Sequence, residues 1–269
     1  MVALIVQVRS EILVKIASKI WSILYIFLDM INSNNKREFR VAKIIARSGF
    51  CSRRKAESLI LEKKVRINGN LIDSPALNIS LNDKVTINGT LIPDIKPTEV
   101  YLYHKPIGLI VSRNDEKNRP TIFSDLPKFM NGMFSVGRLD KNTSGLLLIT
   151  NDGELSRYLE HPKNSIKRTY LVNVDNNISE KKLQLIRSGI SIDNFHYKKI
   201  DISRINSKKE IIYKMELSEG KNREIRKIIS FLGIKIIKLE RISYGPFKLG
   251  KLNPSEYKKS NIDIAEFLK

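Results

Sequence analysis

The spacing of hydrophobic positions changes along the chain, and each change predicts a different kind of structure. Between residues 12 and 31, apolar residues recur at helical spacing, which predicts an amphipathic helix. From residue 37 onward, two short helical patterns precede two alternating segments, 64–69 and 84–89, that each end in Asn-Gly. Because Asn-Gly favours the tight turn of a hairpin, this stretch predicts two helices followed by β-hairpins.

Pro93 and Pro97 predict a linker after the hairpins, and strand and helix signals alternate beyond it. Residues 101–103, 133–136 and 146–150 have strand-like patterns, and Asn-Asp-Gly at 151–153 leads into a predicted helix at 154–160. The sequence therefore indicates a small first domain and a larger second one.

The first 36 residues form a separate N-terminal extension. Its longest uncharged run, residues 20–28, lies between Lys19 and Asp29 and is too short to span a bilayer. It has no small-residue cleavage site, so a signal peptide fits badly. A helix packed on the body, a membrane-surface anchor, or translated upstream sequence before a start at Met30 remain as interpretations. We favour the last, because the polar run after Met30 is typical of a flexible N-terminus.

The charge of the chain indicates a polyanionic partner. Lys and Arg number 48 against 28 Asp and Glu, giving a net charge of +20. A single cysteine, Cys51, excludes an intrachain disulfide and predicts a reducing compartment, the cytoplasm. The three histidines are scattered without ligand spacing, so no metal site is expected.

Basic residues gather in the first predicted domain. Arg40, Lys43 and Arg47 share one face of its first helix, and Arg53, Arg54 and Lys55 crowd the first turn of its second. Cations there oppose the helix dipole, so a nearby phosphate would stabilise them. The candidate RNA-binding residues are Arg40, Lys43, Arg47, Arg53, Arg54, Lys55, Lys64 and Arg66.

Three segments of this domain, 40–43, 52–56 and 65–69, resemble the small RNA-binding domain named after ribosomal protein S4. A solvated basic face on an ordinary helical hairpin would show similar charges. The resemblance covers about 50 residues and implies contact with RNA.

Asp140 is an acid on a polar loop between two predicted apolar strands, where chemistry can be exposed on a rigid scaffold. Arg138 lies two residues earlier, on the same side if the backbone is extended. A close guanidinium would lower the pKa of the carboxyl and keep it ionised, as a nucleophile or base requires. Taken alone, most such pairs are loop salt bridges.

The whole segment 137–145, followed by Leu-Leu-Leu-Ile-Thr-Asn-Asp-Gly-Glu-Leu, is similar to the signature of the RsuA family of ribosomal RNA pseudouridine synthases. That family carries an S4-like domain at its N-terminus, so the two resemblances occur in the expected order. They imply an α+β protein with an RNA-binding domain and linker at 37–97 and a catalytic domain at 98–258. The catalytic domain would have a central mixed or antiparallel sheet flanked by helices, followed by a tail at 259–269.

The resemblance also implies an active site. Asp140 matches the catalytic aspartate, Tyr170 the tyrosine that stacks on the target base, and Arg226 the basic residue paired with the aspartate. Ile225 would help wall the pocket, and Arg138 is a second candidate partner of Asp140. By themselves, Tyr170 could be a core-facing strand residue and Arg226 a surface arginine.

The implied reaction breaks the bond from uridine N1 to C1′, turns the uracil, and joins C5 to C1′. It needs no cofactor, but the uridine must be flipped out of its stack. Segment 113–127 is closer to family members that act on large-subunit (23S) ribosomal RNA, so we expect a stem-loop or assembling subunit as substrate and a monomeric enzyme.

Alternatives remain open. Small-subunit ribosomal RNA could be the substrate, or the chain could be a non-catalytic ribosomal RNA-binding assembly factor. An RNA hydrolase or deaminase would need a zinc set or second carboxylate that the sequence does not offer. A membrane-surface protein built on residues 1–31 is the weakest alternative.

Overall fold

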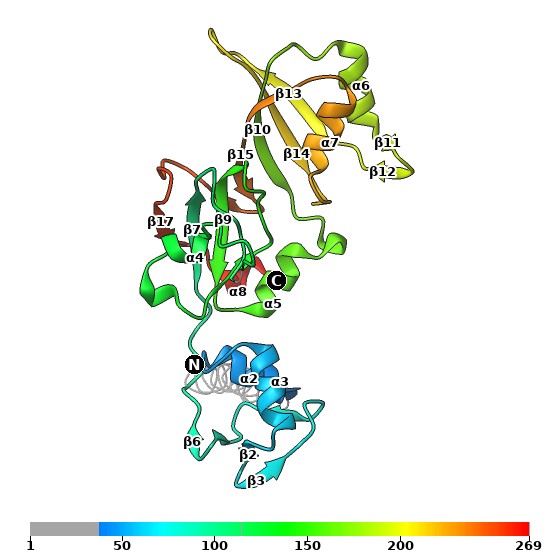
Figure 1. The fold of residues 1–269 in the computed structure, drawn as a ribbon. Coiled ribbons are helices and arrows are strands. Elements are labelled where there is room, and N and C mark those ends of the chain that lie inside the picture. Colours follow the sequence, from blue (N-terminus) through cyan, green and yellow to red (C-terminus); the bar gives the residue numbers. More distant parts are fainter. Residues whose placement is uncertain (1–37, 114, 269) are drawn as a thin grey trace, which may run out of the picture. The chain divides into compact units, whose positions relative to one another are not determined.

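The computed structural model describes residues 38–113 and 115–268 and divides the chain into two compact units, residues 1–96 and 97–269 (Figure 1). The predicted extension, residues 1–36, lies outside the described residues.

The first unit contains two helices and short strands. Its elements are β1 (Glu38–Arg40), α2 (Val41–Arg47), α3 (Arg53–Leu61), β2 (Val65–Ile67), β3 (Asn70–Ile72), β4 (Asn78–Ser80), β5 (Val85–Ile87) and β6 (Thr90–Leu91). Four of the strands form a sheet in the order β3-β2-β5-β6, and β1 pairs with β4.

The hairpin turns of this unit follow from the Asn-Gly pairs. Asn68 and Gly69 have φ values of 50° and 87°, and they join β2 to β3. Asn88 and Gly89, with φ values of 50° and 81°, join β5 to β6. Consecutive left-handed residues match the twist of the strands, so the predicted hairpins are present.

The core of the first unit lies between its helices and its sheet. One face of each helix is buried against alternate strand residues, which leaves the basic residues outside. The buried residues include Val41, Ile45, Ala56, Ile60, Val65, Val85 and Ile87.

The second unit is larger and alternates strands with helices. Its elements are β7 (Val100–Lys105), α4 (Ile122–Asp125), η1 (Lys128–Met130), β8 (Phe134–Val136), β9 (Ser144–Thr150), α5 (Gly153–Glu160), η2 (Pro162–Asn164), β10 (Arg168–Val174), α6 (Glu180–Ser188), β11 (Ile190–Ile192), β12 (Phe195–Tyr197), β13 (Asp201–Ile205), β14 (Ile211–Leu217), α7 (Glu224–Phe231), β15 (Ile236–Tyr244), β16 (Phe247–Lys248), β17 (Tyr257–Lys259) and α8 (Ile264–Phe267).

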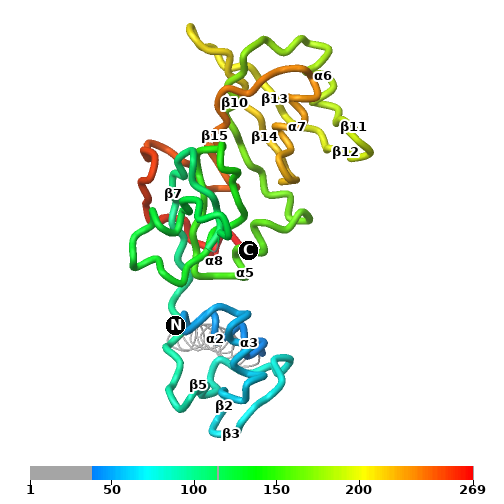
Figure 2. The backbone as a smooth tube through the Cα atoms, viewed as in Figure 1, coloured from blue at the N-terminus to red at the C-terminus, as the bar shows by residue number. Residues whose placement is uncertain are grey.

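A nine-stranded mixed sheet organises this unit, in the order β13-β14-β10-β15-β9-β7-β17, with β16 and β8 paired to β15 and β9. The backbone trace shows β15 running from the half of the sheet that contains β10 and β14 toward the half that contains β7 (Figure 2). Its pairing with β9 is parallel and involves only two residue pairs, Glu240 with Ser144 and Arg241 with Gly145. The predicted α+β class with a mixed sheet is confirmed.

Strand β9 is buried on both faces, which explains its unbroken apolar run. Leu146 and Leu148 join a cluster with residues of α5 and β16, and Leu147 and Ile149 join a second cluster with Tyr103 of β7. A strand that is covered on both faces has no solvent-facing positions, so its sequence lacks alternating polar residues.

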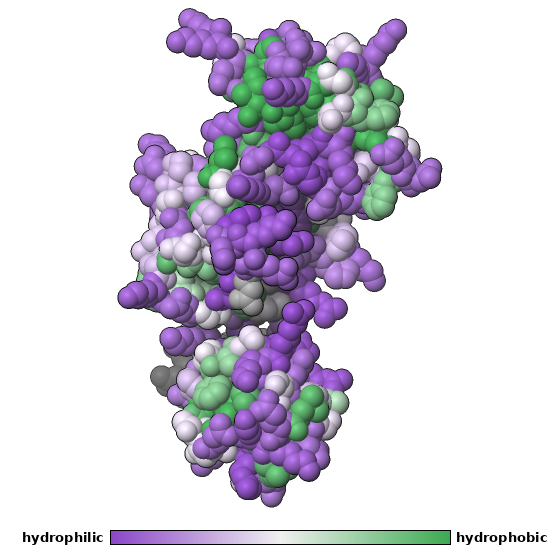
Figure 3. Space-filling model, in the orientation of Figure 1, coloured by the Kyte–Doolittle hydropathy of each residue, from purple (hydrophilic) through white to green (hydrophobic). Residues whose placement is uncertain are grey.

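Helices α6 and α7 cover the half of the sheet that contains β10 and β14. Ile225, Ile228 and Ile229 of α7 pack against Val172 of β10 and Met215 of β14. Polar side chains cover most of the visible face of both units (Figure 3).

Residues 259–269 were predicted as a tail. The structure places the end of β17 and helix α8 there, and Phe267 of α8 packs against a core cluster of the second unit. Within the described ranges, none of the helices is both long and apolar enough to cross a membrane.

Candidate active site

Asp140 lies in the loop that joins β8 to β9. Its neighbour Leu139 is buried, which anchors the loop to the core, while 32% of the Asp140 side chain is exposed. The backbone N–H of Thr143 donates to the carbonyl oxygen of Asp140 at 3.0 Å, which closes a turn just before β9. The carboxylate is therefore held on a short rigid loop and remains accessible.

Two arginines from the start of α7 face this carboxylate. The Nη1 atom of Arg223 lies 3.4 Å from Oδ2 of Asp140, and Nε of Arg226 lies 3.8 Å from the same oxygen. Burial lowers the pKa of the Arg226 guanidinium, Arg223 lowers it further, and Asp140 raises it. Both arginines carry positive charge at neutral pH, so the carboxylate of Asp140 faces two cations.

Arg226 also holds the loop that carries Asp140. Its Nη2 atom donates to the carbonyl oxygen of Asn142 at 2.8 Å and to Oγ1 of Thr143 at 3.3 Å. A planar guanidinium has donors for both tasks.

Arg138 does not take the place suggested by its spacing. Its side chain is exposed, and no ion pair joins it to Asp140 in the part of the chain that the structure describes. Arg223 is the second cation at Asp140 instead. It is brought there by the tertiary fold from a segment distant in sequence, which spacing within one loop could not reveal.

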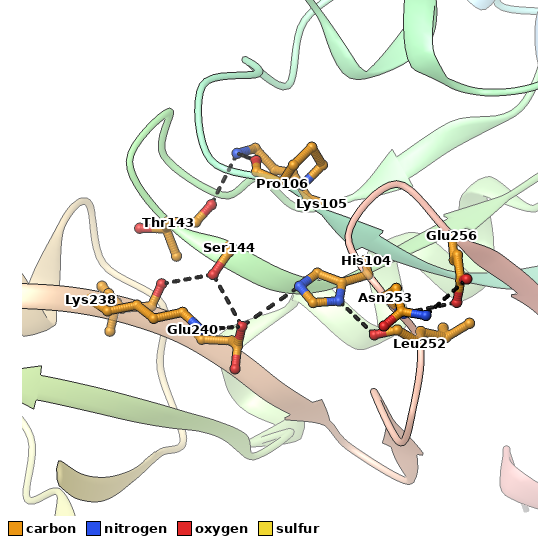
Figure 4. A network of polar contacts seen from close by, with 11 residues as sticks. His104, Lys105, Pro106, Thr143, Ser144, Lys238, Glu240, Leu252, Asn253 and Glu256 are labelled. Carbon is orange, nitrogen blue, oxygen red and sulfur yellow. Dashed lines mark hydrogen bonds and ion pairs between the residues drawn. The ribbon is translucent and has the colours of Figure 1, made fainter. Parts of the chain in front are cut away.

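A buried lysine also holds the loop that carries Asp140. Lys105, at the end of β7, is fully buried, and its Nζ atom donates to the carbonyl oxygens of Pro106 and Thr143, each at 2.9 Å (Figure 4). Burial lowers the pKa of Lys105 to about 8, and the nearby charge of Asp140 acts in the opposite direction. Lys105 thus links the carboxylate loop to the central sheet.

Strand β9 is fixed below the loop by a second polar network. The hydroxyl of Ser144 donates to Oε1 of Glu240 at 3.3 Å, and Nε2 of His104 lies 3.6 Å from the same oxygen (Figure 4). Lys238 completes the group, with Nζ 3.1 Å from Oε1 of Glu240. This network ties β7, β9 and β15 together beside the candidate site.

Gly145 allows β9 and β15 to approach closely. Its φ is 105°, and a Cβ built on it would lie 2.6 Å from the backbone nitrogen of Arg241. Arg241 is buried, and its Nε atom donates to the carbonyl oxygen of Leu146 at 2.7 Å. Both the backbone conformation and the space require glycine here.

Tyr170 and Ile225 both belong to hydrophobic clusters of the second unit. Tyr170 of β10 is partly buried and packs against two clusters, one containing Leu139 and the other containing Ile225. A β-bulge between Thr169 and Tyr170 interrupts the pairing of β10 with β15. Ile225 is itself buried in the core under α7.

Comparison with known proteins identifies the family of this chain. Residues 99–231 match the model for RNA pseudouridylate synthase, and residues 39–90 match the S4 domain. An uncharacterized RNA pseudouridine synthase of Rickettsia felis is 40% identical over 228 residues, covering 84% of this chain and 99% of the relative. The chain belongs to the RNA pseudouridine synthase family.

Other similarities agree with this RNA pseudouridine synthase assignment. The ribosomal large subunit pseudouridine synthase B of Bacillus subtilis is 34% identical over 220 residues, covering 81% of this chain and 90% of the relative. A crystal structure of a pseudouridylate synthase superposes with a TM-score of 0.60 and 27% identity, covering 86% of this chain and 99% of that one. The resemblance to the RsuA family is confirmed.

The S4 domain of this pseudouridine synthase presents the predicted basic residues, several of them with partners. Ser52 caps α3 by accepting from the backbone N–H of Lys55, so Arg53, Arg54 and Lys55 stand exposed in a first turn without an acidic residue. Arg53 pairs with Glu57 at 3.3 Å.

The other basic candidates are spread over the S4 domain. Arg40 precedes α2 rather than lying on its face, and its Nη1 atom donates to the carbonyl oxygen of Ala76 at 2.5 Å. Lys43 lies over the ring of Phe39, and Arg47 is in the last turn of α2. Lys64 pairs with Glu62 at 2.6 Å, and Arg66 donates to the carbonyl oxygen of Gly69.

Proposed function

We propose that this pseudouridine synthase isomerises a uridine of large-subunit (23S) ribosomal RNA, with Asp140 as its catalytic carboxylate. The observation that supports this proposal best is the carboxylate of Asp140, partly exposed and faced by Arg223 and Arg226. The names of the Bacillus subtilis relative and of similar proteins from Pseudomonas aeruginosa and Yersinia pestis support the large-subunit substrate.

The reaction moves a bond within one nucleotide. The bond from uracil N1 to ribose C1′ breaks, the uracil turns, C5 bonds to C1′, and the proton on C5 passes to N1. Flipping the uridine out of its stack costs a few kcal/mol. Stacking on Tyr170 would return about 1–3 kcal/mol, and phosphate contacts of the S4 domain would supply the rest.

Asp140 acts in this proposal either by adding to the nucleotide or by removing a proton from its sugar. Both routes need the ionised carboxylate, and the two arginines provide the positive field that favours it. We propose that the enzyme acts on ribosomal RNA in the cytoplasm, as a monomer.

Mapping pseudouridine in ribosomal RNA tests the proposal. Ribosomal RNA from cells that lack the protein should lose one or more large-subunit pseudouridines, and the purified protein should restore them. Asp140→Asn should bind the same RNA fragment with nearly unchanged affinity and form no pseudouridine. If the lost pseudouridine lies in small-subunit RNA, the substrate is small-subunit RNA instead. An unchanged map, or normal turnover by Asp140→Asn, would contradict the proposal and leave an RNA-binding assembly factor as the alternative.

A further inference from the structure

Two buried glutamates enclose the segment that presents the arginines to Asp140. Glu219 follows β14 and is 7% exposed, and Glu224 begins α7 and is 4% exposed. The segment between them includes Lys221 and Arg223. Carboxyl groups are seldom buried unless they are paired. Each of these two, at the ends of one short loop, therefore needs a hydrogen-bond or ion-pair partner.

Glu219 has partners that favour its ionised form. Its Oε1 atom accepts from the backbone N–H of Lys198 at 3.0 Å and lies 3.0 Å from Nζ of Lys221. Burial raises the pKa of Glu219, but the hydrogen bonds from Lys198 and Lys221 and the positive charge of Lys221 lower it, and the pKa is lowered overall. Both contacts use Oε1, so Oε2 of Glu219 can accept another hydrogen bond.

Glu224 has the opposite environment. Its Oε2 atom accepts from the backbone N–H of Lys221 at 3.0 Å, whereas its buried Oε1 atom meets no donor among the described residues. Burial, together with the negative charge of Glu219, raises the pKa of Glu224 to about 7. A carboxyl oxygen without a donor is the natural position for a proton.

We propose that Glu224 is protonated at Oε1 and donates to the carboxylate of Glu219, and that this hydrogen bond positions Arg223 and Arg226 against Asp140. The pair shares one proton, and no other atom changes its bonding. The inference rests on the proposed function, because its consequence for catalysis depends on the role of Asp140.

The backbone conformation of the segment between Glu219 and Glu224 explains why both of its ends must be held. Arg223 has φ 53° and ψ 31°, a left-handed conformation that costs a residue other than glycine about 1 kcal/mol. That conformation sets the first residue of α7, and Arg226 follows within the first turn. With Glu219 and Glu224 joined, both ends of the segment are fixed and the strained residue between them is held.

The charged groups around the pair have other partners as well. Lys221 faces Glu219 and also donates to the carbonyl oxygen of His196. The guanidinium of Arg168 lies 3.7 Å from a Cβ built on Gly220 and is hydrogen-bonded to Tyr244. Strand β11, which packs on α7, contributes no titratable side chain, and the charged residues of β15 are engaged with one another or with β9.

Loss of the shared proton would leave two carboxylates in a buried site, and their repulsion would open the loop. A glutamine at position 224 removes this sensitivity, because its amide donates to Glu219 and its carbonyl still accepts from Lys221. Alanine at position 224 removes both contacts. Glu180→Gln, at an exposed residue of α6, is the matched control.

The experiment measures single-turnover rate constants for pseudouridine formation at saturating RNA, across neutral and mildly alkaline pH. The wild-type and Glu180→Gln rates should fall as the pH rises through about 7, while Glu224→Gln should stay flat through that range. Glu224→Ala should be about 10-fold slower than Glu224→Gln at every pH, with the dissociation constant for RNA unchanged, because a buried hydrogen bond no longer holds the segment. Lys105, whose pKa is about 8, could also lower the rate as it loses its proton. A decline in rate with that origin would persist in Glu224→Gln.

An infrared titration tests the pair without relying on activity. The carbonyl band of a protonated carboxylic acid should be present in the wild type below neutral pH and missing in Glu224→Gln. No such band in the wild type, or a pH profile of Glu224→Gln that falls with that of the wild type, overturns the inference. If the wild type modifies no RNA at all, the proposed function fails, and the infrared result still decides whether the proton is shared.

Discussion

Arg226 directs its Nε atom at Oδ2 of Asp140, 3.8 Å away, while its Nη2 atom donates to the loop that carries the same aspartate. One guanidinium therefore provides charge to the carboxylate and also fixes its position. Only 17% of the Arg226 side chain is exposed, compared with 50% of Arg223, so water screens its charge less.

Lysine in place of Arg226 should therefore be more damaging than lysine in place of Arg223. Arg226→Lys keeps the charge but lacks the planar set of donors, and we expect its single-turnover rate constant to fall about 100-fold. Arg223→Lys should lose about 10-fold or less, as expected for a more exposed pair. Rates measured at saturating RNA would test this, and equal losses would contradict the dual role of Arg226.

Replacing Gly145 by alanine should destabilise the second unit. The added Cβ would collide with the backbone of Arg241, which cannot move without breaking the pairing of β15 with β9. We expect a loss of about 3 kcal/mol in the free energy of unfolding, measured in urea. Gly132 is the matched control, because its φ of 96° is similar but its Cβ position is open. Gly132→Ala should cost about 1 kcal/mol, and a similar cost at both positions would show that backbone conformation alone matters.

The shared proton of Glu224 also predicts how stability depends on pH. Its pKa is about 7 in the folded protein and 4.5 in a model glutamate, so the folded state binds more protons between these values. Stability from this group is full below pH 4.5 and decreases as the pH rises through about 7. Glu219, whose pKa is lowered, acts in the opposite sense and only below its usual range.

The measurement compares the wild type with Glu224→Gln by urea unfolding at several pH values. Between mildly acidic and neutral pH, the wild type should lose on the order of 1–3 kcal/mol relative to the variant. A constant difference between the two proteins over that range would show that Glu224 does not change its protonation there.

Arg53 and Arg54 should contribute phosphate contacts of the S4 domain. Neutralising both, as Arg53→Gln with Arg54→Gln, should weaken binding to a ribosomal RNA fragment and reduce the slope of log affinity against log salt by about 1–2. Lys208 and Lys209, in an exposed loop of the second unit, offer a control pair for the same loss of charge. An unchanged slope in the arginine variant would argue against phosphate at this helix end.

The sequence predicted the local elements best. Asn-Gly pairs predicted the hairpins, and helical spacing predicted α2 and α3, because these features depend on neighbouring residues. The position of Asp140 on a loop between strands also followed from the apolar runs on either side of it. The arrangement of Arg226 beside Asp140 followed from resemblance to a family, not from periodicity.

The sequence did not predict contacts that the tertiary fold creates. Arg223 reaches Asp140 across 83 residues, and a single loop contains no signal for it. No local pattern distinguishes Lys105, although it is fully buried and donates to the loop that carries Asp140. Glu219 and Glu224 share a motif, but only their burial in the fold points to the proposed pair. A glycine within a strand, such as Gly145, was the one local hint of a close backbone approach.

The pairing of β9 with β15 is the one place where the two halves of the central sheet are hydrogen-bonded in the described chain, and it is two residue pairs long. Asp140 and Lys105 belong to one side of this seam, and Tyr170, Arg223 and Arg226 belong to the other. The cluster under α7 belongs to one half alone, whereas Tyr244 and Phe247 pack with β9 and α5 across the seam. A lesion confined to the seam should therefore stop chemistry while the half under α7 keeps its shape, since the reacting groups would no longer meet.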